Sequence, residues 1–567
     1  MKKMSITKVE KLVMRILPFY LFTFLPLYMV AQPNWVKKAT KSVFTLKTFG
    51  ADGTLIGSAN GFFTSERGEA VSSFSPFKGA STAVVIDAQG NELPVECMLG
   101  ANDTYDVAKF RVTAKKTIPL TIAGSNATEN TTVWLLPYRE QKSLPEGTIR
   151  KAETFRDDYD YYTVALSMPE GTVSCPLLNE AGEVVGLMQQ PYGQNDTLNY
   201  AVSARFADSL KINGLSINDA TLRSTNIKKD LPTDVTQAIL TLYVGRSTVD
   251  SASYVQLVED FIQRFPNAPE GYTYRAQMET SYQNFAAAAA DMEKAIKVAD
   301  KKDEAHSNYA SLIYQKEVYM SDASFDGWSL DKALEEAREA ERLNPMATYR
   351  HQQALILFAQ KKYAEASDIY PTITNSEMRS ADLFYEASKC RQMLNDTIGR
   401  IAMLDSCVAL FSQPYLREAA PYLFARAEAL LDANRYRPAV NDLNEYEKLM
   451  STTVNDRFYY IRYQAEVGGR LFQQALNDID KAIDMNPNYD FYYAEKASLL
   501  VRVGMYDEAL ETAQKCVELA PDHSDGFLFL GLAQCLKGDK QEGVKNLKKA
   551  RELGDPQADN LIKKYSE

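Results

Sequence analysis

Histidine is scarce in this sequence. The 567-residue chain has three, His306, His351 and His523, and none lies between residues 32 and 232. Histidine is the most frequent base beside a nucleophilic serine or cysteine. The first third of the chain therefore lacks the side chain that a Ser–His or Cys–His pair requires.

Cysteine is also rare, which limits the metal, redox and disulfide chemistry that the chain supports. None of the six cysteines forms a C-x-x-C pair, so the sequence supports neither a zinc site nor thioredoxin-like redox chemistry. Six cysteines in a chain of this length do not make a disulfide scaffold. We expect no metal and no cofactor. The cysteines are Cys97, Cys175, Cys390, Cys407, Cys516 and Cys535.

An excess of positive charge is absent as well. The chain has 63 Lys and Arg against 74 Asp and Glu, a formal net charge of -11. Binding to phosphates requires clustered basic side chains, so a nucleic-acid partner is not expected.

The first 31 residues have the features of a signal peptide. Five basic residues precede an uninterrupted apolar stretch over 16–31, and Ala31 is a suitable residue for cleavage before Gln32. The stretch is short for a membrane span and contains two prolines, although an uncleaved anchor is the alternative. We expect an exported protein, periplasmic or secreted, with no transmembrane segment after cleavage.

The remaining chain divides into two halves with different periodicity. Short apolar runs separated by D-G, R-G and Q-G-N turns predict an all-β domain over 36–206. A polar stretch over 207–234 is interpreted as a linker. Long Ala- and Leu-rich helical segments follow over 235–567.

The helical half repeats itself. Small residues recur twelve positions apart, as in Ala427/Ala439 and Ala497/Ala509, and prolines close successive units about 34 residues apart. Small side chains allow two antiparallel helices to approach closely, and proline ends the second helix. The pattern resembles the tetratricopeptide repeat, which implies an all-α solenoid of about eight or nine helix pairs.

Three segments of the first half resemble trypsin-like serine proteases of the chymotrypsin fold. They are "SANGFFTSERGEAVSSFSPFKGA", "NDTYDVAKFRV" and "GTVSCPLLNEAGEVVGL", which are similar to the family's histidine, aspartate and serine segments. The resemblance implies a pair of β-barrels. Together the two halves predict a double barrel followed by a solenoid.

The resemblance also assigns the positions of the catalytic triad. Ser75 stands at the histidine position, Asp106 at the aspartate position and Val173 at the serine position. Loss of serine or histidine alone reduces turnover by a factor on the order of 10⁶ in a studied protease. We therefore expect a pseudoprotease in which Asp106 is retained for structural reasons, with Ser75 as its hydrogen-bond partner.

One enzymatic alternative stays open. Ser174 and Cys175 lie directly after the nucleophile position and are candidates for a noncanonical hydrolase. Activation of either residue requires a base or a positive neighbour, and no histidine is available in the domain.

The leading functional hypothesis is an exported scaffold or adaptor that binds a protein or peptide in the solenoid groove. Tyrosines favour interfaces, so Tyr459, Tyr460, Tyr492 and Tyr493 are candidate contacts. The alternative for these rings is packing between repeats. A further alternative is a factor in envelope stress or assembly, which would differ from the scaffold or adaptor only in the partner that it binds.

The repeat resemblance also places two cysteines on neighbouring helices. Cys516 would lie on the second helix of one repeat and Cys535 on the first helix of the next. We therefore consider a disulfide between them, provided that their Cα atoms lie within about 7 Å.

Overall fold

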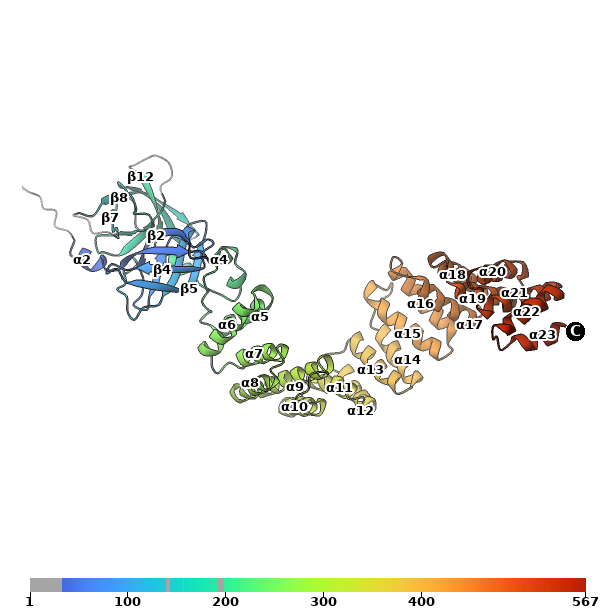
Figure 1. The fold of residues 1–567 in the computed structure, drawn as a ribbon. Helices are drawn as coiled ribbons and strands as arrows, with labels where there is room; N and C mark the ends of the chain where they lie inside the picture. The colour runs from blue at the N-terminus through green and yellow to red at the C-terminus, as the bar shows by residue number, and fades with distance from the viewer. Residues whose placement is uncertain (1–32, 139–142, 157, 191–197, 567) are drawn as a thin grey trace, which may run out of the picture. The chain divides into compact units, whose positions relative to one another are not determined.

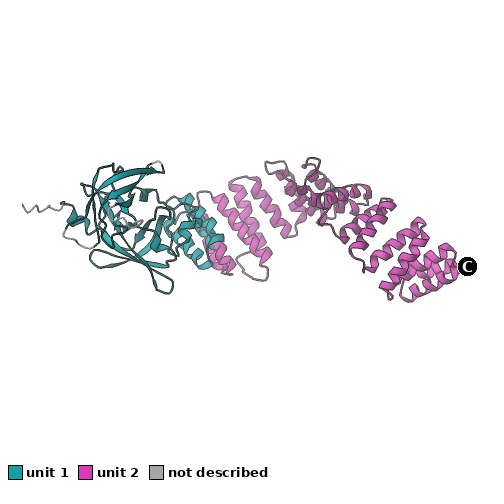
Figure 2. Cartoon of the chain, turned by 90° about the horizontal axis from the view of Figure 1, so that it is seen from above, with its two compact units in different colours: residues 1–275 teal, residues 276–567 magenta. Residues whose placement is uncertain are grey.

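The computed structural model describes residues 33–138, 143–156, 158–190 and 198–566. The chain forms two compact units, and the boundary between them in the sequence lies between Arg275 and Ala276. Figure 1 shows the secondary structure, and Figure 2 colours the two units separately. The signal peptide expected over 1–31 lies outside the described residues. No helix within the described ranges is long and apolar enough to cross a membrane.

The first β-barrel is a closed antiparallel sheet with the strand order β1-β2-β3-β6-β5-β4. Alternate residues of its strands point inward, and Phe44, Leu46, Met98 and Phe110 are fully buried. Its strands are β1 (Val43–Phe49), β2 (Leu55–Phe63), β3 (Glu69–Ser72), β4 (Thr82–Ile86), β5 (Glu92–Asn102) and β6 (Val107–Val112).

The second barrel repeats this topology with the order β10-β11-β12-β9-β8-β7. Side chains of β2, β6, β11 and β12, including Phe62, Val107, Val184 and Val202, share one buried cluster between the two barrels. The prediction of a double barrel is therefore confirmed. The strands are β7 (Thr132–Leu135), β8 (Glu146–Phe155), β9 (Tyr159–Ala165), β10 (Pro176–Leu178), β11 (Val184–Met188) and β12 (Leu198–Ser203).

The segment expected to be a linker is instead packed onto the first barrel. The backbone of Met98 in β5 donates to Lys228 O at 2.7 Å and accepts from the Asp230 amide at 2.9 Å. Leu222 and Ile227 are each 4% exposed and belong to the core of that barrel. The segment also contains α3 (Phe206–Ser209), η2 (Ser216–Asn218) and α4 (Ala220–Arg223). Because the segment is mostly polar, its composition did not indicate that Leu222 and Ile227 belong to the core.

The helical array contains nine helix pairs and a final helix over residues 235–566, all of which the structure describes. This agrees with the expected eight or nine pairs. The first helices of the pairs are α5 (Val235–Thr248), α7 (Pro269–Ser281), α9 (Lys302–Tyr319), α11 (Ala347–Ala359), α13 (Ala381–Met393), α15 (Ala420–Asp432), α17 (Asp456–Gly468), α19 (Asp490–Val503) and α21 (Ser524–Lys537). The second helices are α6 (Ser251–Arg264), α8 (Phe285–Val298), α10 (Leu330–Leu343), α12 (Tyr363–Thr374), α14 (Thr397–Val408), α16 (Tyr436–Met450), α18 (Phe472–Met485), α20 (Tyr506–Leu519) and α22 (Lys540–Glu552), and α23 (Ala558–Ser566) ends the array.

The recurring small residues occupy the helix crossings. Ala427, Ala439, Ala497 and Ala509 are fully buried. A Cβ placed on Gly531 of α21 would lie 2.7 Å from the carbonyl oxygen of Gly543 in α22, closer than real Cβ atoms come. Side chains at these crossings would therefore separate the helices.

The first helix pair belongs to the same compact unit as the barrels. Asp230 forms ion pairs with Arg111 of β6, at 3.2 Å, and with Arg264 of α6, at 2.5 Å. Lys228 pairs with Asp260 of α6 at 2.6 Å. The compact units divide near residue 275, although the helical array begins at Val235, where a change to helical structure is expected.

Candidate functional site

Ser75 and Asp106 meet at the surface of the first barrel. Ser75 begins the short helix η1 (Ser75–Phe77), and Asp106 lies in the turn between β5 and β6. The amide and hydroxyl of Ser75 donate to the same Asp106 oxygen, Oδ1, at 2.6 and 2.8 Å. The expected hydrogen bond is therefore present. Ser75 is exposed and Asp106 is half-buried.

Val173 lies on a loop of the second barrel that is bound to the first. The Asn60 side chain of β2 donates to Gly171 O at 2.8 Å and to Val173 O at 3.1 Å. The Asn60 amide oxygen accepts from the Thr45 hydroxyl at 3.3 Å. Sequence reasoning missed this role of Asn60. The only sign of it was an amide side chain within the apolar run "SANGFF" of β2.

Ser174 is enclosed between the barrels. Its side chain has no exposed area, and its hydroxyl donates to the Ser73 hydroxyl at 2.8 Å. Its backbone is left-handed, with φ of 65°. The hydroxyl that the alternative hypothesis requires as a nucleophile is thus buried and directed at another serine.

Cys175 is buried as well. Loss of water contact raises the pKa of its thiol to about 12. The thiolate is the nucleophilic form of cysteine, and burial in apolar surroundings disfavours it. Neither candidate for a noncanonical hydrolase therefore has the exposure that a nucleophile requires.

All three histidines lie in the helical array, each next to a carboxylate. His306 Nδ1 is 2.5 Å from Glu336 Oε2, and His351 Nε2 is 2.6 Å from Glu386 Oε2. His523 Nδ1 lies 2.8 Å from Asp490 Oδ2. Over the described ranges, no group of three or more His, Cys, Asp or Glu side chains is arranged to hold a metal ion.

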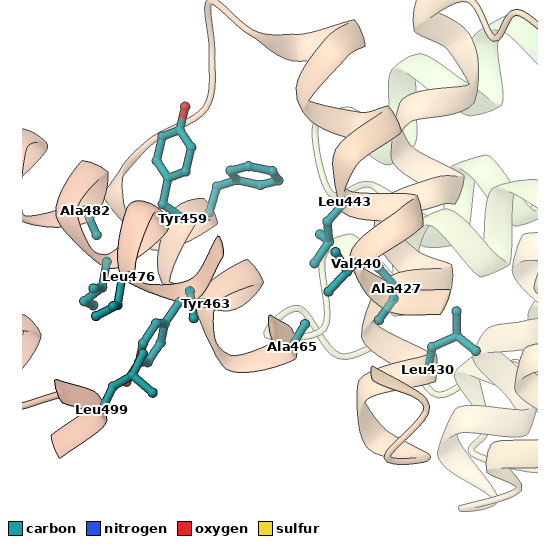
Figure 3. Close-up of a cluster of buried hydrophobic side chains, with 14 of the residues drawn as sticks. Ala427, Leu430, Val440, Leu443, Tyr459, Tyr463, Ala465, Leu476, Ala482 and Leu499 are labelled. Carbon is teal, nitrogen blue, oxygen red and sulfur yellow. The ribbon is translucent and has the colours of Figure 1, made fainter. Parts of the chain in front are cut away.

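The four tyrosines proposed as partner contacts divide into two classes. Tyr459 and Tyr492 are buried, and their hydroxyls donate to Glu447 at 2.8 Å and Asp456 at 3.0 Å. In Figure 3, Tyr459 and Tyr463 leave α17 in different directions, and Tyr463 reaches toward Leu499. Tyr459 and Tyr492 are therefore part of the packing between helices.

Tyr460 and Tyr493 are half-buried and stay candidates for partner contact. The Tyr460 hydroxyl accepts from Gln464 at 3.1 Å, and its ring lies 5.4 Å from the Phe491 ring. The Tyr493 hydroxyl donates to Pro487 O at 3.0 Å.

A groove lies between two first helices, α9 and α11. Its volume is about 370 Å³, and Gln352 is held in its wall by hydrogen bonds to Ser307 and Ser311. No Asp, Glu, Lys or Arg is among its lining residues, which are Ser307, Ser311, Tyr314, Gln315, Tyr319, Thr348, His351, Gln352, Leu355 and Ile356. The array therefore has a concavity of mixed polar and apolar lining between neighbouring first helices.

The disulfide considered between Cys516 and Cys535 is not formed in the structure, and both thiols are free and buried. Cys516 of α20 lies opposite Gly526 near the start of α21, whereas Cys535 lies near the end of α21, opposite Gly543 of α22. Nine residues of α-helix span about 13 Å, which separates the two thiols.

The geometry agrees with the comparison to known families. Residues 59–187 match the family model described as a trypsin-like peptidase domain. The two barrels form a trypsin-like domain. Solved structures similar to it include the active form of the Rv3671c protease from M. tuberculosis, 16% identical, covering 35% of this chain and 86% of that chain with a TM-score of 0.28. The serine endoprotease from Yersinia pestis is also 16% identical, covering 33% and 65% of the two chains with a TM-score of 0.27.

Curated relatives include proteins named for tetratricopeptide repeats. The DnaJ homolog subfamily C member 7 homolog of Dictyostelium discoideum is 20% identical over 291 residues, 49% of this chain and 52% of that protein. The small glutamine-rich tetratricopeptide repeat-containing protein 2 of Saccharomyces cerevisiae is 26% identical over 93 residues, 16% and 27%. Hsp70-Hsp90 organizing protein 1 of Glycine max is 30% identical over 125 residues, 21% of each chain. The match thus spans about half or less of these relatives. The trypsin-like domain is followed by an array of tetratricopeptide type.

Proposed function

We propose that the protein is an exported scaffold or adaptor. Its trypsin-like domain does not hydrolyse peptides, and its helical array binds partner proteins. The observation that supports the first part is the Ser75–Asp106 hydrogen bond, since the family resemblance assigns Ser75 to the histidine position and its side chain is a hydroxyl. The domain contains no histidine that could take over as the base.

Two further observations support a domain without catalysis. The family resemblance assigns Val173 to the nucleophile position, and the neighbouring Ser174 hydroxyl is fully buried. The thiol of Cys175 is buried and has a raised pKa, which favours its unreactive form.

Protein binding by the helical array is supported by its surface. First helices of such arrays line an extended binding face, and the groove between α9 and α11 lies on two of them. Relatives of this part of the chain include proteins named for organising Hsp70 and Hsp90. Export is supported by the charged and apolar segment over residues 1–31.

Activity-based labelling tests the catalytic part. The purified full chain, with trypsin as positive control, should take up no fluorophosphonate probe and hydrolyse no peptide substrate between pH 5 and 9. Val173→Ser should not restore activity, because a hydroxyl without a base is a weak nucleophile. Labelling of the wild type that disappears in Ser174→Ala would instead support the noncanonical hydrolase.

Affinity capture from the envelope fraction of the producing cells tests the binding part. The full chain should retain specific partners, and a fragment that ends after α6 should lose them. Equal recovery on both baits would assign binding to the trypsin-like unit.

A further inference from the structure

Aromatic rings and two carboxylates gather on three successive first helices, α17, α19 and α21. We call Tyr460, Tyr489, Phe491, Glu495 and Asp525 the acidic aromatic face. The Phe491 ring lies 5.4 Å from Tyr460 and 5.8 Å from Tyr489. Tyr489 is 44% exposed, Asp525 is exposed, and the other three residues are half-buried. The rings and carboxylates are therefore accessible from solvent.

Glu495 is held in place by a tyrosine and not by a cation. The Tyr463 hydroxyl donates to the Glu495 backbone oxygen at 2.9 Å and to its Oε2 at 3.1 Å. Burial raises the pKa of Glu495, and the nearby Asp525 carboxylate raises it further. The Asp525 carboxylate thus disfavours the ionised form of Glu495.

Neighbouring cations are directed elsewhere. Lys496 forms an ion pair with Asp480 at 2.6 Å, and the Arg502 guanidinium lies 5.0 Å from the centre of the Phe472 ring. Among the ion pairs of the described residues, none includes Glu495 or Asp525. The pKa of the His523 imidazole is raised first by Asp490, which lies 2.8 Å from its Nδ1, and to a smaller extent by Asp525. No ion pair within the described residues therefore compensates the two carboxylates of this face.

A bound cation would remove this imbalance. A positive charge favours the ionised carboxylate and offsets the repulsion between the two acids. Aromatic faces also attract ammonium and guanidinium groups. Perturbed acids on an accessible surface often mark sites that bind a ligand.

We propose that the acidic aromatic face binds a lysine or arginine side chain in an extended segment of a partner protein. The proposal rests on the proposed function, since it specifies the partner that the helical array binds. Successive first helices present contacts at a regular spacing, which suits an extended polypeptide. The solvent-accessible parts of these rings suit the aliphatic stem of a long basic side chain.

An array of immobilised random peptides, probed with the purified full chain, tests this proposal. Peptides retained by the wild type should be enriched in Lys and Arg and depleted in Asp and Glu. The double variant Glu495→Gln/Asp525→Asn should lose this enrichment. Its affinity for a selected basic peptide, measured by fluorescence anisotropy, should fall about tenfold or more. The matched control Glu511→Gln, an exposed acid on α20, should bind as the wild type does.

The single variant Asp525→Asn changes an exposed side chain. It should lower the affinity for the basic peptide without altering the circular-dichroism spectrum. Retained peptides without basic enrichment, or enrichment that survives the double variant, would overturn this proposal and leave the binding function intact. A wild-type chain that retains no peptide and captures no protein would overturn the proposed function itself.

Discussion

Arg462 of α17 and Asp478 of α18 form a buried bidentate pair, with Nε to Oδ2 at 2.5 Å and Nη2 to Oδ1 at 3.0 Å. Arg426 of α15 and Asp442 of α16 repeat this geometry at 2.8 and 2.7 Å, again sixteen residues apart. The two helices of a pair are thereby joined by charge as well as by apolar packing.

Removal of the Arg462 side chain should lower the stability of the helical array. Arg462→Ala leaves the buried Asp478 with only Lys481, at 3.4 Å, as a cationic partner, and breaking a buried pair costs about 3–5 kcal/mol. Urea unfolding followed by far-ultraviolet circular dichroism should show the loss. Arg457→Ala, at an exposed position of the same helix, is the control and should change stability by less than about 0.5 kcal/mol. Equal stability of the two variants would contradict a structural role of the pair.

Glu466 should make the helical array less stable as the pH rises. Burial raises its pKa from 4.5 to about 8, and its Oε2 accepts no hydrogen bond. Between these two values the folded chain binds more protons than the unfolded chain, so stability falls with increasing pH. Glu466→Gln should remove this dependence and gain on the order of 3 kcal/mol over the wild type by pH 8.

Urea unfolding of both proteins at pH 5, 6.5 and 8 measures the effect. The advantage of the glutamine variant should be smallest at pH 5. An advantage that does not change with pH would show that Glu466 keeps its ordinary pKa.

Asp106 should contribute to stability. Asp106→Ala leaves the Ser75 amide and hydroxyl without their acceptor, which should cost about 1–2 kcal/mol. Asp106→Asn keeps an acceptor and tolerates the left-handed backbone at this position, where φ is 50°. Thermal melts should therefore rank wild type, asparagine variant and alanine variant in decreasing order. Equal melting temperatures of all three proteins would show that Asp106 has no structural role.

The trypsin-like unit should require the segment after residue 206. A fragment over residues 33–268 keeps Leu222 and Ile227 in the barrel core and keeps the Asp230–Arg264 ion pair. It should be soluble and unfold cooperatively. A fragment over residues 33–206 exposes apolar core surface and should aggregate. Cooperative melting of the shorter fragment at the same temperature would show that the segment is only a linker.

The thiols should be protected in the folded chain. All six cysteines are buried, and burial raises the pKa of Cys516 to about 12. A thiol reagent should react slowly with the native protein. After denaturation without reductant, the same reagent should modify all six thiols. Non-reducing peptide mapping that finds Cys516 linked to Cys535 would contradict the structure.

Local patterns in the sequence determined the two fold classes. The twelve-residue spacing of Ala497 and Ala509 is enough to predict a helix crossing, because such contacts join residues close together in the chain. Turn motifs and the segments around Ser75, Asp106 and Val173 likewise predicted a double barrel of trypsin type. The Ser75–Asp106 hydrogen bond followed from this alignment.

Only the tertiary structure decided which polar and aromatic side chains are enclosed. Asn60 holds the Val173 loop across 113 residues of sequence, and Ser174 is buried against Ser73 across 101. Tyr459 is buried while its neighbour Tyr460 is half-buried. Burial and pairing over such distances depend on how separate elements pack against each other, and no local period in the sequence encodes that packing.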